Sequence, residues 1–244
     1  MVPEQFRIIR TNLQYFLPKK EKPNIMVTST LSGEGKSFIS LNLAAVHALA
    51  GKKSIVLEFD IRKPRILSEL GMTKGPGLTN YLVGKTDDIA SLIQPIQGVE
   101  NLFVLGCGPV PPNPAEILLD GRMEGLFQYL QSHFDVVVID TAPVGMVSGG
   151  VTLGKYADYT VYVTRQNYSF KKQLVLIDDY YKQKRLPGLS ILLNDVKIRS
   201  GYGYYGYGRY GYGYGYGAYG TGYYDDEKKS RGMFGGIINW WRRT

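Results

Sequence analysis

A glycine-rich loop constrains the fold more than any other segment of this sequence. The loop from Gly33 to Ser37 reads Gly-Glu-Gly-Lys-Ser and stands between an apolar run at 25–29 and a helical pattern over 36–50. Glycines let backbone N–H groups face phosphate oxygens, and the N-terminus of the following helix adds partial positive charge. The order strand, loop, helix therefore predicts a nucleotide site, although Thr30 stands where the usual first glycine of the motif would be.

Continuous apolar runs predict that this loop sits on a buried parallel sheet. Five further runs have little polar alternation and are separated, in most cases, by segments of helix length. The runs are 54–59, 102–105, 136–139, 160–163 and 189–193, and the helical segments are 36–50, 114–131 and 168–185. Strands buried on both faces by helices have this pattern. We predict an α/β fold of the P-loop NTPase type, a parallel sheet flanked by helices on both faces.

The 244 residues divide into one body and several appendages. Apolar positions 6, 9, 13 and 16 have helical spacing, so residues 1–23 are predicted to form an N-terminal helical segment. Residues 24–200 form the P-loop domain. Residues 201–224 hold eleven tyrosines, ten glycines and almost no aliphatic side chains, so they cannot bury a core and are expected to be disordered. Residues 225–244 are basic and aromatic.

Charge placement argues against a nucleic-acid groove. The net charge is +8, but residues 24–196 hold 16 basic and 16 acidic side chains, so the excess lies at the two ends. The single cysteine, Cys107, excludes an intrachain disulfide and is interpreted as an inert small residue in a reducing compartment. No apolar run approaches the roughly 18 residues that a membrane span requires. A cytoplasmic location follows, with the alternative that the chain is the cytoplasmic piece of a longer membrane protein.

Carboxylates stand where two predicted strands end. Glu58 and Asp60 close the run at 54–59, and Asp140 closes the run at 136–139. Because alternate residues of a strand share a face, Glu58 and Asp60 are expected to point into one site. Open α/β sheets bind ligands at the carboxyl ends of their strands. We therefore expect these carboxylates beside the loop, where they hold Mg²⁺ through water and orient the attacking group.

Taken together, these motifs resemble the bacterial tyrosine kinase family, the autokinases that control capsule and exopolysaccharide export. That family is marked by a deviant phosphate loop, an acidic D-x-D-x-R motif, a D-x-x-P motif and a C-terminal tyrosine cluster. The matching segments here are Gly33 to Ser37, Glu58 to Arg62, Asp140 to Pro143 and Tyr202 to Tyr224. The family's E-x-x-R-x-x-R also occurs, as Glu4, Arg7 and Arg10.

The resemblance implies a role for each matching residue. Lys36 would stabilise the transferring γ-phosphoryl group of ATP, and Arg62 would pair with the carboxylates or with phosphate. Asp60, with Glu58, would accept or orient the proton of a tyrosine hydroxyl, whose ordinary pKa is about 10. The expected catalytic residues are Lys36, Glu58, Asp60, Arg62 and Asp140, and the expected Mg²⁺ ligands are Ser37, Asp60 and Asp140. The expected nucleotide-binding residues are Ser32, Gly33, Glu34, Gly35, Lys36, Ser37, Phe38 and Asn194, with Asn194 either a purine contact or a turn residue.

The tyrosine run is interpreted as the phosphoacceptor. Glycine between tyrosines removes obstruction, and a tethered run gives a high local concentration of phenols at a neighbouring site. The predicted acceptors are Tyr202, Tyr204, Tyr205, Tyr207, Tyr210, Tyr212, Tyr214, Tyr216, Tyr219, Tyr223 and Tyr224. The alternative is a self-associating or RNA-stacking low-complexity tract.

Partners follow from the same resemblance. It implies a homo-oligomer through Glu4, Arg7 and Arg10, which could otherwise be an ordinary solvated ion-pair face. It also implies a membrane component for chain length or export, a protein-tyrosine phosphatase, and a position at the inner face of the membrane. The terminal segment around Trp240 and Trp241 could lie at a membrane interface, or could pack on the body or a partner.

Two rival functions remain open at this level. One is a positioning ATPase like the partition and cell-division ATPases, although the lysine that such proteins carry early in the loop is absent near Thr30. The other is a nucleotide-binding scaffold with a self-associating tail. Two departures from the family pattern, Glu58 in place of Asp and Ser32 in place of Pro, remove no charge, so we expect activity to survive.

Overall fold

The computed structural model describes residues 2–16, 20–111, 114–117, 121–145 and 149–197. The predicted tyrosine-rich segment 201–224 and the terminal segment 225–244 lie outside the described residues. The predictions about the phosphoacceptor tyrosines and the terminal tryptophans therefore stay predictions.

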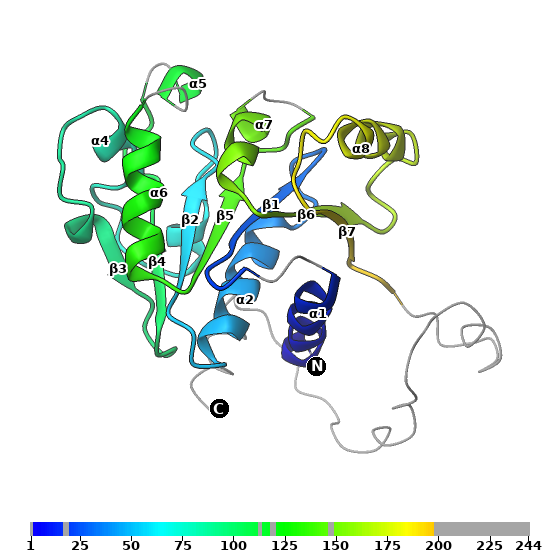
Figure 1. Ribbon diagram of the computed structural model, residues 1–244, viewed down its shortest axis with the longest axis horizontal. Coiled ribbons are helices and arrows are strands. Elements are labelled where there is room, and N and C mark those ends of the chain that lie inside the picture. The colour runs from blue at the N-terminus through cyan, green and yellow to red at the C-terminus, as the bar shows by residue number, and fades with distance from the viewer. Residues whose placement is uncertain (1, 17–19, 112–113, 118–120, 146–148, 198–244) are drawn as a thin grey trace.

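A seven-stranded sheet organises the molecule (Figure 1). Its strands are β1 (Asn24–Ser29), β2 (Ser54–Phe59), β3 (Ile93–Pro95), β4 (Leu102–Leu105), β5 (Val136–Thr141), β6 (Tyr159–Arg165) and β7 (Leu189–Asn194). They lie in the order β3-β4-β2-β5-β1-β6-β7. Every pairing is parallel except that of β3 with β4. The predicted α/β fold is confirmed, and the antiparallel edge strand β3 is a correction to the all-parallel sheet.

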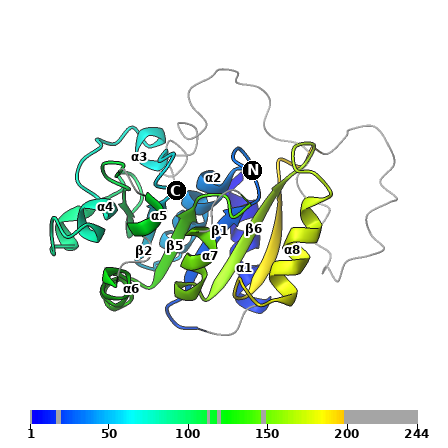
Figure 2. The same ribbon diagram turned by 90° about the horizontal axis from the view of Figure 1, so that it is seen from above.

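Helices cover both faces of the sheet (Figures 1 and 2). The α-helices are α1 (Val2–Phe16), α2 (Lys36–Ala48), α3 (Ile66–Glu69), α4 (Leu78–Leu82), α5 (Pro114–Ile117), α6 (Arg122–His133), α7 (Gly149–Leu153) and α8 (Gln173–Lys182), with 3-10 turns η1 (Ala90–Leu92) and η2 (Gly154–Tyr156). The single helix predicted over 114–131 is two helices here, and α6 begins after Gly121. The helix predicted over 168–185 is shorter, because residues 168 and 169 turn toward the nucleotide loop.

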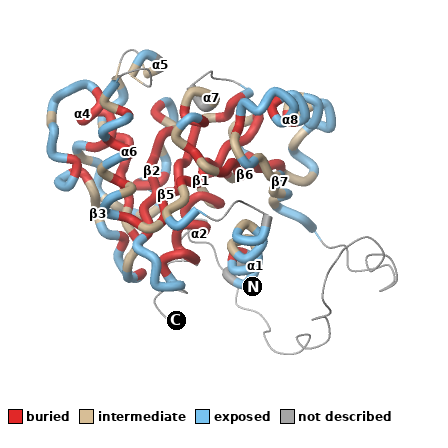
Figure 3. Tube along the Cα trace, viewed as in Figure 1, coloured by how far each residue is buried: buried red, intermediate tan, exposed pale blue. Residues whose placement is uncertain are grey.

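Side chains alternate between two hydrophobic clusters along the central strands. On β1, Ile25 and Val27 pack with α1 and α2, whereas Met26 packs with α6. Figure 3 shows the central strands as the most buried part of the chain, with the outer surfaces of α6 and α8 exposed. Burial on both faces explains why the strands read as continuous apolar runs.

The N-terminal helix α1 packs on α2. Phe6 is 3% exposed, and its ring meets Phe38 of α2 edge to face with a centroid distance of 5.8 Å. Arg10 donates a hydrogen bond from Nη1 to the carbonyl oxygen of Val46 at 2.6 Å. Glu4 and Arg7 form an exposed ion pair at 3.3 Å on the same helix. Of the three predicted oligomer residues, Arg10 thus contacts its own chain, and the other two face solvent.

Candidate functional site

The loop between β1 and α2 has a backbone that only glycine adopts easily. Gly33 has φ +88° and Gly35 has φ +102°, both in the left-handed region. A Cβ on Gly35 would also lie 2.2 Å from Nδ2 of Asn194, which donates a hydrogen bond to the carbonyl oxygen of Glu34 at 2.9 Å. The glycines are therefore required by conformation and by the close approach of β7.

Glu34 supports the loop from beneath. Its side chain is fully buried, and Oε2 accepts a hydrogen bond from the backbone N–H of Leu31 at 2.7 Å. Oε1 accepts a short hydrogen bond from the hydroxyl of Ser169. The carboxylate of this predicted nucleotide-binding residue is thus occupied with protein groups, so its side chain holds the loop in shape.

The connection from β6 to α8 also holds this loop. Arg165 donates from Nη1 to the carbonyl oxygen of Gly33 at 3.0 Å, and Tyr168 donates from its hydroxyl to the carbonyl oxygen of Ser32 at 2.8 Å. Arg165 also pairs with Asp195 at 3.1 Å. Sequence reasoning missed Arg165, Tyr168 and Ser169, because they lie more than 130 positions from the loop along the chain and form no motif.

Lys36 begins α2 between the loop and the carboxylates. Its ammonium group donates to the carbonyl oxygen of Leu31 at the long distance of 3.5 Å. Burial lowers the pKa of this amine, and Asp140, Asp60 and Glu34 act in the opposite direction. The lysine is therefore mostly desolvated, weakly bonded and surrounded by acidic groups, which suits a side chain that reaches for phosphate.

Asp140 ends up against the first turn of α2. Its Oδ2 accepts a hydrogen bond from the Ser37 hydroxyl at 2.7 Å, and its Oδ1 accepts one from the Ser40 hydroxyl at 3.1 Å. Complete burial raises the pKa of Asp140 to about 7, an effect that the Ser37 hydrogen bond and Lys36 oppose and that Asp60 reinforces. The structure thus brings the predicted residues Lys36, Ser37 and Asp140 together and adds Ser40.

Asp60 lies near the same group. Its Oδ1 accepts a hydrogen bond from the backbone N–H of Lys63 at 3.2 Å, which closes the turn after β2. Burial raises its pKa, and the strongest opposing influence is Lys36. Arg62, on the same turn, is exposed.

Glu58 is bonded to two backbone N–H groups. It is 2% exposed; Oε1 accepts from the backbone N–H of Ile66 at 2.6 Å, and Oε2 accepts from the backbone N–H of Cys107 at 3.0 Å. Both oxygens therefore tie the segment after β2 to the segment after β4. The expectation that Glu58 shares one site with Asp60, which follows the end of β2 at Phe59, stays a prediction.

Three other predicted positions have defined surroundings. Phe38 packs on Phe6 of α1. Asn194 ends β7 beside the loop, as described above. Cys107 is buried, and burial, followed by the nearby Glu58 and Asp60, raises the pKa of its thiol to about 12. A thiol with that pKa is not ionised at neutral pH and is a poor nucleophile.

A scan against protein-family models finds no match. Tyrosine-protein kinase YwqD of Bacillus subtilis is 35% identical over 206 residues, which cover 83% of this chain and 85% of that protein. The chain belongs to the bacterial tyrosine kinase family. A putative tyrosine-protein kinase of Staphylococcus aureus, CapB, is 31% identical over 84% of this chain and 89% of its own length.

Other bacterial tyrosine kinases are longer. The chain spans 28% of the tyrosine-protein kinase wzc of Salmonella typhi, at 31% identity. Among solved structures, the kinase domain of Escherichia coli tyrosine kinase ETK matches with a TM-score of 0.73 and 29% identity, over 83% of this chain and 80% of that one. The septum site-determining protein MinD of Pyrococcus horikoshii matches with a TM-score of 0.58 at 20% identity, which shows a shared fold. As a member of this kinase family with a nucleotide loop, the chain is an ATP-using tyrosine-protein kinase.

Proposed function

We propose that this kinase transfers the γ-phosphoryl group of ATP to tyrosines of its own C-terminal run, Tyr202 to Tyr224, and does so between subunits. We further propose that the modification regulates polymerisation and export of a capsule or exopolysaccharide. The observation that carries the proposal is the convergence of Lys36, Asp60 and Asp140 beside the glycine-rich loop. The tyrosine run in the same chain supplies the acceptors.

The described residues fit a nucleotide with Mg²⁺. Lys36 and the backbone N–H groups at the start of α2 would bind the β- and γ-phosphates. Ser37 and Asp140 offer adjacent hard oxygen donors, which suits Mg²⁺, an ion that takes few protein ligands and completes its shell with phosphates and water. Bound Mg²⁺ would offset charge on the phosphate oxygens. Among the described residues, no three Asp, Glu, His or Cys side chains are grouped to hold a metal by themselves.

Asp60 is the proposed acceptor of the tyrosine proton. A phenol with a pKa of about 10 needs a carboxylate at hydrogen-bond distance to gain phenolate character at neutral pH. Burial raises the pKa of Asp60, which makes it a stronger base than an exposed aspartate. Arg62 is proposed to bind phosphate. Glu58 is proposed to position Asp60 through the segment that it ties to Ile66.

The chain is proposed to act as an oligomer with a membrane partner. One similar solved structure is described as the chimerical protein CapA2B2, with a TM-score of 0.72 and 29% identity, which supports a CapA-like partner at the membrane. None of the helices in the described ranges is long and apolar enough to cross a bilayer. We propose a place at the inner face of the membrane, self-association through Glu4, Arg7 and Arg10, and reversal by a protein-tyrosine phosphatase.

Mixing two chains, neither of which can label itself, tests transfer between subunits. The donor chain carries phenylalanine at all eleven positions of the run, and the acceptor chain carries Lys36→Met. Each alone should stay unmodified with ATP and Mg²⁺, and the mixture should yield phosphotyrosine on the acceptor chain. The matched control is Lys85→Met, which replaces an exposed lysine near α4, and this chain should label itself. Self-labelling by wild type without transfer in the mixture would restrict the reaction to a single chain. ATP hydrolysis without any labelling would favour the positioning-ATPase alternative.

A further inference from the structure

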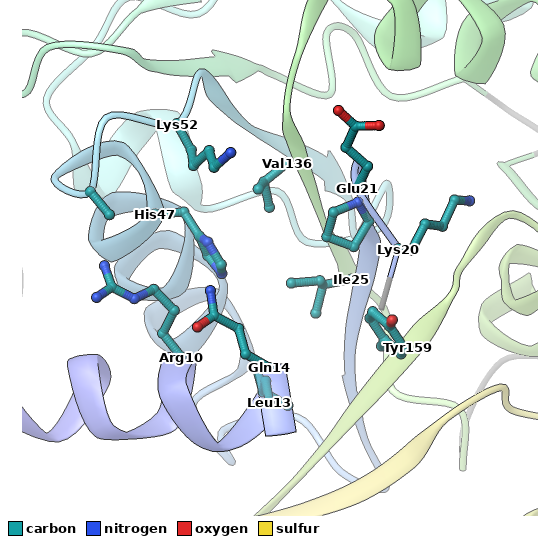
Figure 4. Close-up of a pocket in the computed structure, with 12 residues that line it drawn as sticks. Arg10, Leu13, Gln14, Lys20, Glu21, Ile25, His47, Lys52, Val136 and Tyr159 are labelled. Carbon is teal, nitrogen blue, oxygen red and sulfur yellow. The ribbon is translucent and has the colours of Figure 1, made fainter. Parts of the chain in front are cut away.

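A pocket lies at the end of the sheet opposite the nucleotide loop (Figure 4). It has a volume of about 470 Å³ and is formed by α1, the C-terminal end of α2 and the first residues of β1, β5 and β6. Leu13, Ile25, Val136 and Tyr159 give it apolar walls. A pocket of this size and lining has room for an aromatic ring.

One side of this pocket is positively charged. Arg10, His47 and Lys52 lie together on the α2 side, and Glu21 and Lys20 lie across from them (Figure 4). Lys20 is paired with Asp158 at 2.6 Å. Within the described ranges, neither Arg10 nor Lys52 forms an ion pair with an acidic side chain. Arg10 donates one of its five N–H groups to the carbonyl oxygen of Val46.

The His47 side chain, on the same side of the pocket, has an unsatisfied polar atom. It is 6% exposed, and its Nε2 is buried without a hydrogen-bond partner among the residues that the structure describes. Burial, and then Arg10 and Lys52, lower its pKa to about 4. A buried imidazole beside two unpaired cations is a costly arrangement that a bound carboxylate or phosphate would relieve.

We propose that this pocket binds the segment Tyr223 to Glu227 of the same chain. Its sequence, Tyr-Tyr-Asp-Asp-Glu, joins aromatic rings for the apolar walls to carboxylates for Arg10 and Lys52. These are the only three acidic residues after Lys197, and the rest of that region is basic, so charge selects this segment over the others.

The connecting chain is long enough to reach. The residues from Lys197 to Tyr223 span up to about 85 Å when extended, whereas a body of this size is roughly 40 Å across. The tyrosine run would then be held at both ends, because β7 ends beside the nucleotide loop and the acidic segment sits at the far end of the sheet. If the proposed function holds, phosphate on Tyr223 or Tyr224 would add about two negative charges and tighten this contact.

The two histidines of the chain provide a direct test with an internal control. His47 lines the pocket, and His133 ends α6 elsewhere. Ring-proton titrations by NMR would compare two full-length chains, both carrying Lys36→Met so that phosphorylation cannot intervene. One keeps the acidic segment, and the other carries Asp225→Asn, Asp226→Asn and Glu227→Gln. The pKa of His47 should be about one pH unit higher with the acidic segment, as expected for one carboxylate placed near it. His133 should titrate alike in both.

A labelled peptide of residues 222–228 completes the test. Added to the chain with the neutralised segment, it should bind and raise the pKa of His47, and a peptide phosphorylated on Tyr223 should bind more tightly. Lys52→Glu should weaken binding at least tenfold, and the matched variant Lys85→Glu should leave it unchanged. Identical His47 titrations in the two full-length chains would overturn the proposal. Peptide binding that is absent, or indifferent to Lys52→Glu, would overturn it as well, and neither result depends on kinase activity.

Discussion

Glu58→Gln separates a structural role for this side chain from a catalytic one. The substitution keeps the shape of the side chain but leaves one oxygen acceptor where the carboxylate has two. In the structure those two oxygens accept hydrogen bonds from the backbone N–H groups of Ile66 and Cys107, at 2.6 and 3.0 Å, and the Glu58 side chain is buried. One of these N–H groups would face the donor NH₂ of glutamine and lose its partner.

The expected cost follows from these two hydrogen bonds. A buried N–H group without a partner costs about 1–3 kcal/mol, and the remaining bond loses the added strength of a charged acceptor. Removing a buried charge offsets part of this loss of stability. We expect the free energy of unfolding to fall by about 2 kcal/mol, or a Tm decrease of roughly 4–8 °C for a chain of this size. Autokinase activity measured well below the Tm should be reduced only in part.

Urea denaturation followed by circular dichroism would measure the stability change, and phosphotyrosine formation would measure the activity. Asp60→Asn is the matched comparison, since Asp60 accepts one turn hydrogen bond and its pKa is raised by burial. That variant should keep wild-type stability and lose activity. If Glu58→Gln instead kept full stability and abolished labelling, the positioning role assigned to Glu58 would be refuted.

Three further substitutions test other parts of the structure. Since burial raises the pKa of Asp140 to about 7, the contribution of this group to the stability of the apoprotein should fall as pH rises from about 4 to 7. Asp140→Asn should therefore be more stable than wild type at pH 8, by up to about 4 kcal/mol, with no gain below pH 4, and equal urea midpoints at pH 8 would contradict this. Gly35→Ala should weaken ATP binding at least tenfold by calorimetry, because the new Cβ would clash with Asn194. The control Gly51→Ala, also at positive φ but with open space around it, should bind ATP normally. Tight ATP binding by Gly35→Ala would contradict the loop geometry. Phe6→Ala should lower stability by about 3 kcal/mol as α1 loses its anchor on α2, and the exposed Ile8→Ala should not, so unchanged thermal melting of Phe6→Ala would place α1 away from the body.

The sequence predicted those parts of the fold that depend on local pattern. Six strands were recognisable because burial on both faces makes them continuously apolar, and the loop was recognisable because strand, glycines and helix are consecutive. The edge strand β3 was not, since it has three residues, includes Pro95 and is only partly buried. The separate helices α5 and α6 were not predicted, because the residues over 114–131 have the length and pattern of a single helix.

The candidate site was predictable only where its residues belong to motifs. Ser40 had a usable signal, because it follows Ser37 by three residues and shares its helical face. Arg165 and Ser169 had none, since their approach to the loop depends on β6 lying next to β1 in the sheet. The two hydrogen bonds of Glu58 were not predictable, because Ile66 and Cys107 follow different strands and form no motif with it.

Intact mass after incubation with ATP and Mg²⁺ would show whether the chain phosphorylates its own tyrosine run. The full chain and its Lys36→Met variant would be compared, with phosphopeptide mapping of residues 198–244. We expect a ladder of added phosphoryl groups in the wild type, located between Tyr202 and Tyr224 and absent in Lys36→Met. A single unshifted mass in the wild type, with a CapA-like membrane segment supplied and ATP still being hydrolysed, would contradict it.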